Sequence, residues 1–236
     1  MNAVLLGWPY LGLLVAPLIV LWLATERRPV GAPASRWDDP ASVLPLLWPM
    51  YLVHQFEEHG IDLLGRHYSF LGELCRTLGH AADPSHCPAD PAFIFAVNAV
   101  GCQITFACAA IFRRRAPLIA ACAWGVAIVN AATHLGSAVA HRAYNPGAFT
   151  SAVLFVPLSA WMLRTVVRAG AVRRAEVARV VATGAVLHAV LLGSLALAGR
   201  GALPRAGLLL VNALNGLWPL ALGTIGVRAS RAVAER

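Results

Sequence analysis

The sequence contains no lysine and few charged residues of either sign. Only 13% of its 236 residues are charged, whereas a soluble domain usually carries about 25%. Hydrophobic residues make up 58% of the chain and recur in long runs along its whole length, so no stretch remains for a separate soluble domain. The composition excludes an ordinary soluble protein and predicts a single integral membrane domain over residues 1–236.

The formal charge of +8 does not indicate nucleic-acid binding. All 19 basic residues are arginines, and they lie between the apolar runs. Positive residues flank the spans of membrane proteins, so membrane topology explains them. We therefore expect no nucleic-acid partner; the predicted partners are the lipid bilayer and, for any enzyme in it, a lipophilic small molecule.

A cleaved signal peptide and transmembrane strands are not expected either. The first 20 residues lack a basic n-region, and their apolar run is too long for a signal peptide, so we interpret them as a retained first span. The alternation of polar and apolar residues that membrane strands require is absent, and open strands would leave backbone groups unpaired in lipid. The predicted fold class is therefore all-α, a polytopic transmembrane helix bundle.

The apolar runs predict about seven spans, each near the roughly 20 residues that a transmembrane helix needs. They cover residues 3–24, 43–62, 91–112, 117–140, 148–168, 179–199 and 206–227. The loops after the first, third and fifth spans and the C-terminal tail hold 14 of the 19 arginines, namely Arg27, Arg28, Arg36, Arg113, Arg114, Arg115, Arg164, Arg168, Arg173, Arg174, Arg179, Arg228, Arg231 and Arg236. The positive-inside rule then predicts a cell-membrane protein with its N-terminus outside and its C-terminus in the cytoplasm.

The longest connection, about residues 63–90, lies outside the cell in this topology. It carries an approximate apolar stripe at helical spacing, which predicts one external interfacial helix; the stripe consists of Leu64, Tyr68, Leu71, Leu74, Cys75 and Leu78. Cys75 and Cys87 share this loop, where an oxidising compartment permits a disulfide, and we predict that they are joined. Spacing alone does not establish the bridge. Cys102, Cys108 and Cys122 fall within spans and are expected to pack as small apolar residues.

The second predicted span carries three ionisable residues on one helical face. Its sequence is LPLLWPMYLVHQFEEHG, in which Glu57 lies about 60° to one side of His54 and Glu58 about 40° to the other. An ionisable residue at the centre of a span costs on the order of 2.5–3.5 kcal/mol. Pairing, protonation or a metal ion must therefore compensate this group, unless both glutamates lie at the interface and meet water there.

The fourth predicted span supplies a partner for this face. Asn130, His134 and His141 fall within about 40° of one another on its helical wheel. Since the two spans run antiparallel, His134 and His54 lie at similar depths below the outer surface, and so do Asn98 and Asn212. A single histidine on an apolar helix is usually a core residue, which is our interpretation of His188.

These residues resemble a known family. The segment His54-Gln55-Phe56-Glu57-Glu58, a later His134 and the turn Tyr144-Asn145-Pro146-Gly147 are similar to the HXXEE domain family of bacterial membrane proteins. That family's signature is an HXXEE motif, one further histidine and a YXPG motif, and the resemblance covers about residues 43–160. It implies which residues matter but no biochemical activity. We assign the further histidine to His134 rather than His141, because Asn130 and His134 precede Tyr144 as an NxxxH pattern.

The leading functional hypothesis is a membrane-embedded metalloenzyme, a hydrolase or oxidoreductase acting on a lipophilic substrate. The predicted ligands are drawn from His54, Glu57, Glu58 and His134, and they suit zinc or iron. In the preferred arrangement His54, Glu58 and His134 bind the ion and Glu57 acts as general base. Asn98 or Tyr144 then orients a bound water or a substrate oxygen.

Two other functions use the same residues. A metal-free acid–base catalyst, such as an isoprenoid cyclase or isomerase, needs only a protonated glutamate and a histidine partner. A proton-coupled transporter would use the carboxylates and imidazoles as a relay. The sequence leaves the substrate, the metal and the oligomeric state open.

Overall fold

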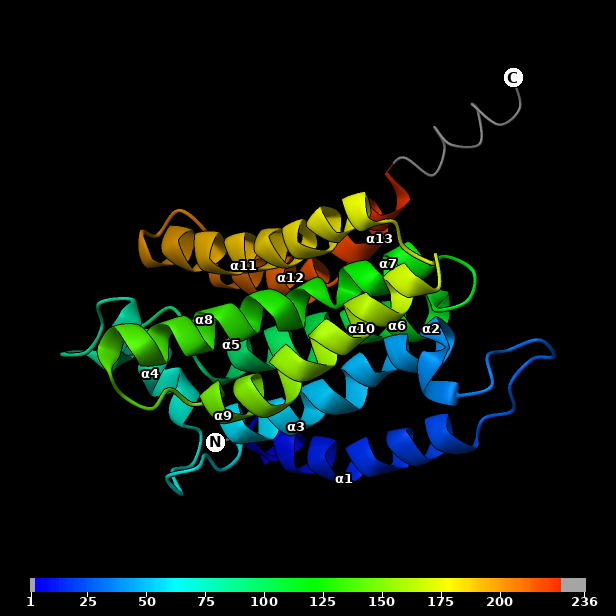
Figure 1. Cartoon of the computed structure of the whole chain (residues 1–236). Coiled ribbons are helices and arrows are strands. Elements are labelled where there is room, and N and C mark those ends of the chain that lie inside the picture. Colours follow the sequence, from blue (N-terminus) through cyan, green and yellow to red (C-terminus); the bar gives the residue numbers. More distant parts are fainter. Residues whose placement is uncertain (1–2, 226–236) are drawn as a thin grey trace.

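The computed structural model describes residues 3–225 and consists of α-helices packed side by side in a bundle (Figure 1). Within these residues no β-strand forms, and the only bridge of that kind joins Ile61 to His67. The predicted all-α class is therefore confirmed. Arg228, Arg231 and Arg236, which contributed to the predicted topology, lie outside the described residues.

Helix α3 (Leu47–His59) carries the HXXEE motif through the middle of the bundle. It continues the short helix α2 (Pro40–Val43) through a 3₁₀ turn, so the chain is helical from Pro40 to His59. Asp39 begins this segment because its side chain accepts a hydrogen bond from the Ala41 amide at 2.9 Å and Pro40 occupies the first helical position. Helix α1 (Ala3–Thr25) packs along one side of α3.

Two of the remaining helical segments contain a π-helical stretch. Helices α5 (Pro91–Phe95) and α6 (Cys102–Phe112) are joined by the stretch Ala96–Gly101, and α9 (Ala148–Thr150) and α10 (Val156–Arg168) by the stretch Ser151–Phe155. Such stretches often occur at functional sites. The others are α7 (Pro117–Ala123), α8 (Gly125–His141), α11 (Val177–Gly199), α12 (Arg205–Asn215) and α13 (Trp218–Thr224).

Helices α11, α12 and α13 form a layer on the side of the bundle away from α1 (Figure 1). Gly184 of α11 faces Gly125 of α8, where a Cβ atom on either residue would overlap the backbone of the other helix. The two glycines therefore let these helices approach closely. Trp124 precedes α8, is fully buried and donates from Nε1 to the Leu44 carbonyl at 2.7 Å, which joins α8 to the α2–α3 segment.

Five described helical segments are long and apolar enough to cross a membrane: Ala3–Thr25, Pro91–Phe112, Pro117–His141, Ala148–Arg168 and Arg174–Gly199. A sixth is possible if α12 and α13, which meet at 48°, are one broken span. The predicted second span is not among them, because α3 itself has 13 residues and carries the charged motif. The predicted count of seven is therefore not confirmed, and the predicted seventh span runs past the described residues.

The predicted external loop contains the short helix α4 (Ser69–Thr77), which lies at the same end of the bundle as the N-terminus (Figure 1). The sequence predicted a helix here, although its position at a membrane surface stays a prediction. Cys75 and Cys87 form a disulfide with their Cα atoms 5.7 Å apart, which confirms the predicted pairing. As expected, the three other cysteines are free and buried.

Candidate metal centre

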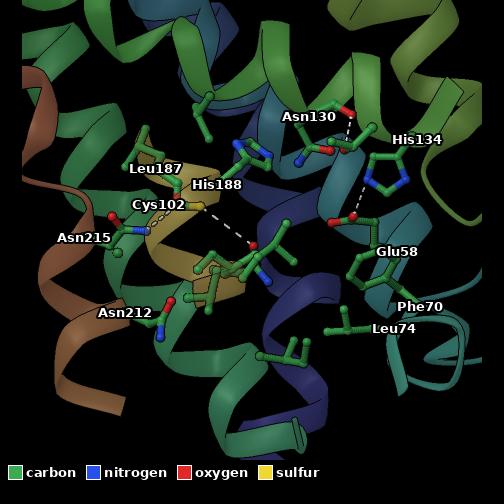
Figure 2. Close-up of a pocket in the computed structure, with 18 of the residues that line it drawn as sticks. Glu58, Phe70, Leu74, Cys102, Asn130, His134, Leu187, His188, Asn212 and Asn215 are labelled. Atoms are coloured by element: carbon green, nitrogen blue, oxygen red, sulfur yellow. Dashed lines mark hydrogen bonds and ion pairs between the residues drawn. The ribbon is translucent and has the colours of Figure 1, made fainter. Parts of the chain in front are cut away.

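Helices α3 and α8 bring two imidazoles and one carboxylate together inside the bundle. His54 and Glu58 lie one turn apart on α3, and His134 faces them from α8. Glu58 Oε1 lies 2.8 Å from His134 Nε2 and 3.4 Å from His54 Nε2, and one ligand atom from each of the three residues lies within 4.8 Å of the others. The side chains of Glu58 and His134 are in contact in Figure 2. None of the three residues is more than 4% exposed.

Each histidine also makes a hydrogen bond through Nδ1, the ring nitrogen that does not face Glu58. The Thr150 hydroxyl donates to Glu57 Oε2, so its oxygen is left to accept from His54 Nδ1–H at 2.7 Å. Asn145 Oδ1 likewise accepts from His134 Nδ1–H at 2.5 Å. The two Nε2 atoms are therefore the ring nitrogens that face Glu58. A partner of this kind fixes the ring orientation of metal-bound histidines in proteins.

The second carboxylate of the motif, that of Glu57, points away from the three-residue group. Glu57 Oε1 accepts from the Tyr144 hydroxyl at 2.6 Å and from the Phe149 amide at 3.2 Å, and Oε2 accepts from the Thr150 amide at 2.7 Å and the Thr150 hydroxyl. Partial burial and the Glu57 carboxylate raise the pKa of Tyr144, so its hydroxyl keeps the proton that it donates. Glu57 is thus saturated by donors at the start of α9 and lies outside the three-residue group; its predicted catalytic role stays a prediction.

The turn Tyr144-Asn145-Pro146-Gly147 encloses the centre. Tyr144 bonds to Glu57 and Asn145 to His134, as described above. Gly147 has φ = +94°, and a Cβ there would lie 2.7 Å from His134 Cε1 and 2.9 Å from His54 Cε1. Only glycine fits between the two rings in this conformation. The turn thus contacts both histidines as well as joining α8 to α9.

Asn98 reaches the group indirectly, through a histidine that the sequence analysis did not select. Its Nδ2 donates to His59 Nε2 at 3.1 Å, and that atom lies 3.4 Å from Glu58 Oε2. The Asn98 side-chain oxygen accepts from Gln55 Nε2 at 3.1 Å. His59 was overlooked because it lies about 140° around the helix from His54. Its proximity to the motif, directly after Glu58, was the available signal.

The other histidines considered from the sequence lie outside the three-residue group. His141 is exposed and bonds to the Ser137 carbonyl one turn back on α8, at 3.0 Å. His188 bonds through Nδ1 to the Gly184 carbonyl at 2.9 Å, within α11, but it also lines the cavity described next. Thr150 and Asn145 were not predicted to act; the sequence placed Asn145 only in a turn.

A cavity of about 270 Å³ adjoins the centre. Glu58 and His134 lie on one side of it and α11 and α12 on the other (Figure 2). Most of its lining is apolar, from residues such as Phe93, Ile94 and Leu187, and Asn130 contributes an amide that donates to the Tyr51 hydroxyl at 2.6 Å. The centre therefore faces a space suited to an apolar ligand with a few polar groups.

The comparisons with known proteins agree with the motif. The model of a family described as "protein of unknown function with HXXEE motif" matches residues 45–162, which include all three residues of the centre and the turn that encloses it. No curated protein and no solved structure matches the chain. The chain belongs to the family of proteins with an HXXEE motif.

Proposed function

We propose that this chain is a multi-pass membrane enzyme in which His54, Glu58 and His134 bind one zinc or iron ion and act on a lipophilic small molecule. One observation carries the proposal: two imidazole nitrogens and a carboxylate oxygen converge within 4.8 Å in a buried position. Atoms that bind one ion at about 2.0–2.2 Å lie about 3–4 Å apart. The three residues are therefore near the spacing that an ion requires.

The hydrogen bonds of the centre support a bound ion over a purely structural cluster. His54 Nε2 is buried and has no hydrogen-bond partner among the described residues, although Nδ1 of the same ring is bonded. An unpaired buried polar atom costs on the order of 1–3 kcal/mol, which coordination would offset. A set of two histidines and one carboxylate occurs in zinc hydrolases and in non-haem iron oxygenases.

Each residue of the site has a distinct part in this proposal. The ion supplies Lewis acidity at the cavity wall. His54, Glu58 and His134 hold it, and Glu57 is a positioning residue that orients His54 through the Thr150 hydroxyl. Tyr144 keeps Glu57 in place, and Asn98 contacts the centre through His59. The cavity beside the centre would receive the substrate.

The decisive measurement is the metal content of the purified protein. Protein in detergent is reconstituted with Zn²⁺ or Fe²⁺, freed of excess metal and analysed by mass spectrometry of the elements. We expect about one ion per chain in the wild type and none in His54→Ala. His141→Ala is the matched control, because it removes an exposed histidine of α8 and should leave the metal content unchanged.

A metal-free wild type would overturn the metalloenzyme. The contact of 2.8 Å between Glu58 and His134 then favours an acid–base catalyst, because a proton can pass along a hydrogen bond of that length. This second candidate predicts that activity survives exhaustive treatment with chelators.

For the membrane arrangement we propose seven crossings with the N-terminus outside. The helical segment Pro40–His59 would be one crossing, its charged motif compensated by the partners described above, and α12 and α13 would together be another. The 14 arginines on one side support this orientation. A reporter fused after Arg115 should report from the cytoplasm, and a signal from outside the cell would overturn the topology.

A further inference from the structure

The wall of the cavity opposite the candidate metal centre carries two asparagines of α12. Asn212 and Asn215 line the cavity and are 1% and 9% exposed. Figure 2 shows both on the side away from Glu58 and His134. The proposed function assigns them no part.

The amide nitrogens of both asparagines are engaged, and their oxygens are not. Asn212 Nδ2 donates to the Ser194 hydroxyl and the Leu208 carbonyl, each at 2.9 Å, and Asn215 Nδ2 donates to the Leu187 carbonyl at 2.9 Å. Neither Oδ1 atom has a hydrogen-bond partner among the described residues. Two buried oxygens at this wall therefore lack a hydrogen-bond donor, and each costs about 1–3 kcal/mol while it is unpaired.

The charges of the lining restrict the class of ligand. Among the described residues that line the cavity there is no arginine, and the whole chain has no lysine. The carboxylates of Glu58 and Glu73 do line it. At the wall that carries Asn212 and Asn215, a phosphate or carboxylate group would therefore be buried without a basic side chain, and it would offer no donor to the two oxygens. An ammonium group would find no free carboxylate in the cavity, because Glu73 pairs with Arg76 and Glu58 would bind the ion. We therefore infer that the polar end of the ligand at this wall is uncharged.

The lining also includes residues that reach the protein surface. Thr77 of α4, Thr133 of α8 and Leu192 of α11 line the cavity and are exposed. The cavity therefore opens between these three helices. Since α8 and α11 belong to segments apolar enough to cross a membrane, an apolar chain can extend from this opening into lipid.

We propose that the cavity binds an uncharged, single-chain amphiphile whose hydroxyl or N–H donors bond to the side-chain oxygens of Asn212 and Asn215 and whose tail leaves between α4, α8 and α11. This inference rests on the proposed function, because it names the substrate class of the same cavity. It requires no metal for binding itself, so the two proposals can be tested separately.

The test is equilibrium binding of tritiated 1-O-oleylglycerol to purified protein in detergent, with unlabelled competitors. This ether lipid has two hydroxyl donors, no charge and no ester to hydrolyse. Its dimethyl ether lacks the donors and should compete about tenfold more weakly, and its phosphate monoester should compete more weakly still. Equal competition by the dimethyl ether, or stronger competition by the phosphate, would overturn the proposal.

Variants locate the binding site. Asn212→Leu and Asn215→Leu should each weaken binding by about fivefold. Gln103→Leu is the control, since it removes a partly buried amide of α6 that does not line the cavity, and it should leave binding unchanged. Leu192→Trp changes an exposed position, so it should fold, and it should weaken binding of both neutral lipids alike by obstructing the opening. Unchanged binding in folded Asn212→Leu and Leu192→Trp proteins would place the lipid elsewhere.

Metal analysis of the same preparations separates the two proposals. His54→Ala should lose the ion and keep most of its affinity for the ether lipid. A metal-free wild type that still discriminates the two neutral lipids would overturn only the proposed function. A wild type that holds metal and does not discriminate them would overturn only the present inference.

Discussion

Glu57 and Glu58 are neighbours in the chain, yet the two sides of α3 on which they lie differ in almost every respect. Glu58 faces two imidazoles and a cavity, with one bare nitrogen beside it. Glu57 faces the start of α9 and accepts four hydrogen bonds from three residues. A carboxylate that is saturated by donors stabilises a structure, whereas one that lies beside an unpaired imidazole nitrogen is suited to bind an ion together with it.

Glu58→Gln should abolish metal binding. The amide is a poor ligand, and it leaves only two imidazoles, so the metal content should fall from about one ion per chain to background. Elemental analysis after reconstitution measures this. Glu73→Gln is the control, because Glu73 also lines the cavity but pairs with Arg76 instead of the histidines. Full metal occupancy in Glu58→Gln would contradict the proposal that Glu58 is a metal ligand and Glu57 is not.

Glu57→Gln should weaken metal binding without abolishing it. The amide cannot accept from all four donors, so Thr150 and the His54 ring behind it lose their fixed orientation. Loss of such an outer partner typically lowers metal affinity about 10–100-fold. Titration against a competing chelator gives the affinity. Complete loss of metal would make Glu57 a ligand, and an unchanged affinity would remove it from the site altogether.

Gly147→Ala should destabilise the protein where the turn between α8 and α9 contacts His54 and His134. A Cβ at φ = +94° would press on both imidazoles, so we expect the free energy of unfolding to fall by about 1–3 kcal/mol. Gly136→Ala is the matched control within α8. No atom lies within 4 Å of a Cβ there, so the free energy of unfolding should rise by roughly 0.5–1 kcal/mol. Unfolding by denaturing detergent measures both, and a shift of the same sign would contradict the packing described.

Asp62, just beyond α3, is saturated in the same way as Glu57 and offers the smallest effect. Burial alone would raise its pKa, but hydrogen bonds from Arg66, Ser69 and Leu64 outweigh burial and hold the pKa below its usual range. A carboxylate with a lowered folded-state pKa contributes stability above the unfolded value of about 3.9, and that stability is lost as the pH falls further through the folded-state value.

Amide hydrogen exchange at Leu64 and Arg66, corrected for the intrinsic rate, should therefore show more local opening as the pH drops below about 4. In Asp62→Asn the opening should already be increased at neutral pH and should not change with acidification. The same pH dependence in wild type and variant would mean that another group holds this loop.

Several of these features could be predicted from the amino-acid sequence. The low charge and long apolar runs predicted an all-α bundle, and the pairing of Cys75 with Cys87 followed from their shared loop. The convergence of His54 and His134 followed from helical periodicity and matched depth; their ring centres lie 5.1 Å apart. The convergence of the two histidines could be predicted because it depends on helix geometry, which is the same in every sequence.

Other features could not be predicted from the sequence. The wheel placed Glu57 and Glu58 on one face with His54, but it could not show that Thr150 and Tyr144 approach one edge of that face and His134 the other. His59 lies on a different face of the helix, and the wheel could not show that its Nε2 atom meets both Asn98 of the neighbouring segment and Glu58. The count of seven spans is not confirmed either, because α3 has 13 residues and carries the charged motif, and the seventh predicted span runs past the described residues.

The residues alone indicate that this chain forms apolar helices and that one of them carries a costly group of ionisable side chains that needs partners. The different surroundings of these side chains depend on the fold: Glu58 faces the imidazoles at the cavity, and Glu57 bonds to the turn and to the start of α9. Periodicity sets the direction in which a side chain leaves its helix, whereas the packing of α8 and α9 against α3 sets which donors it meets there.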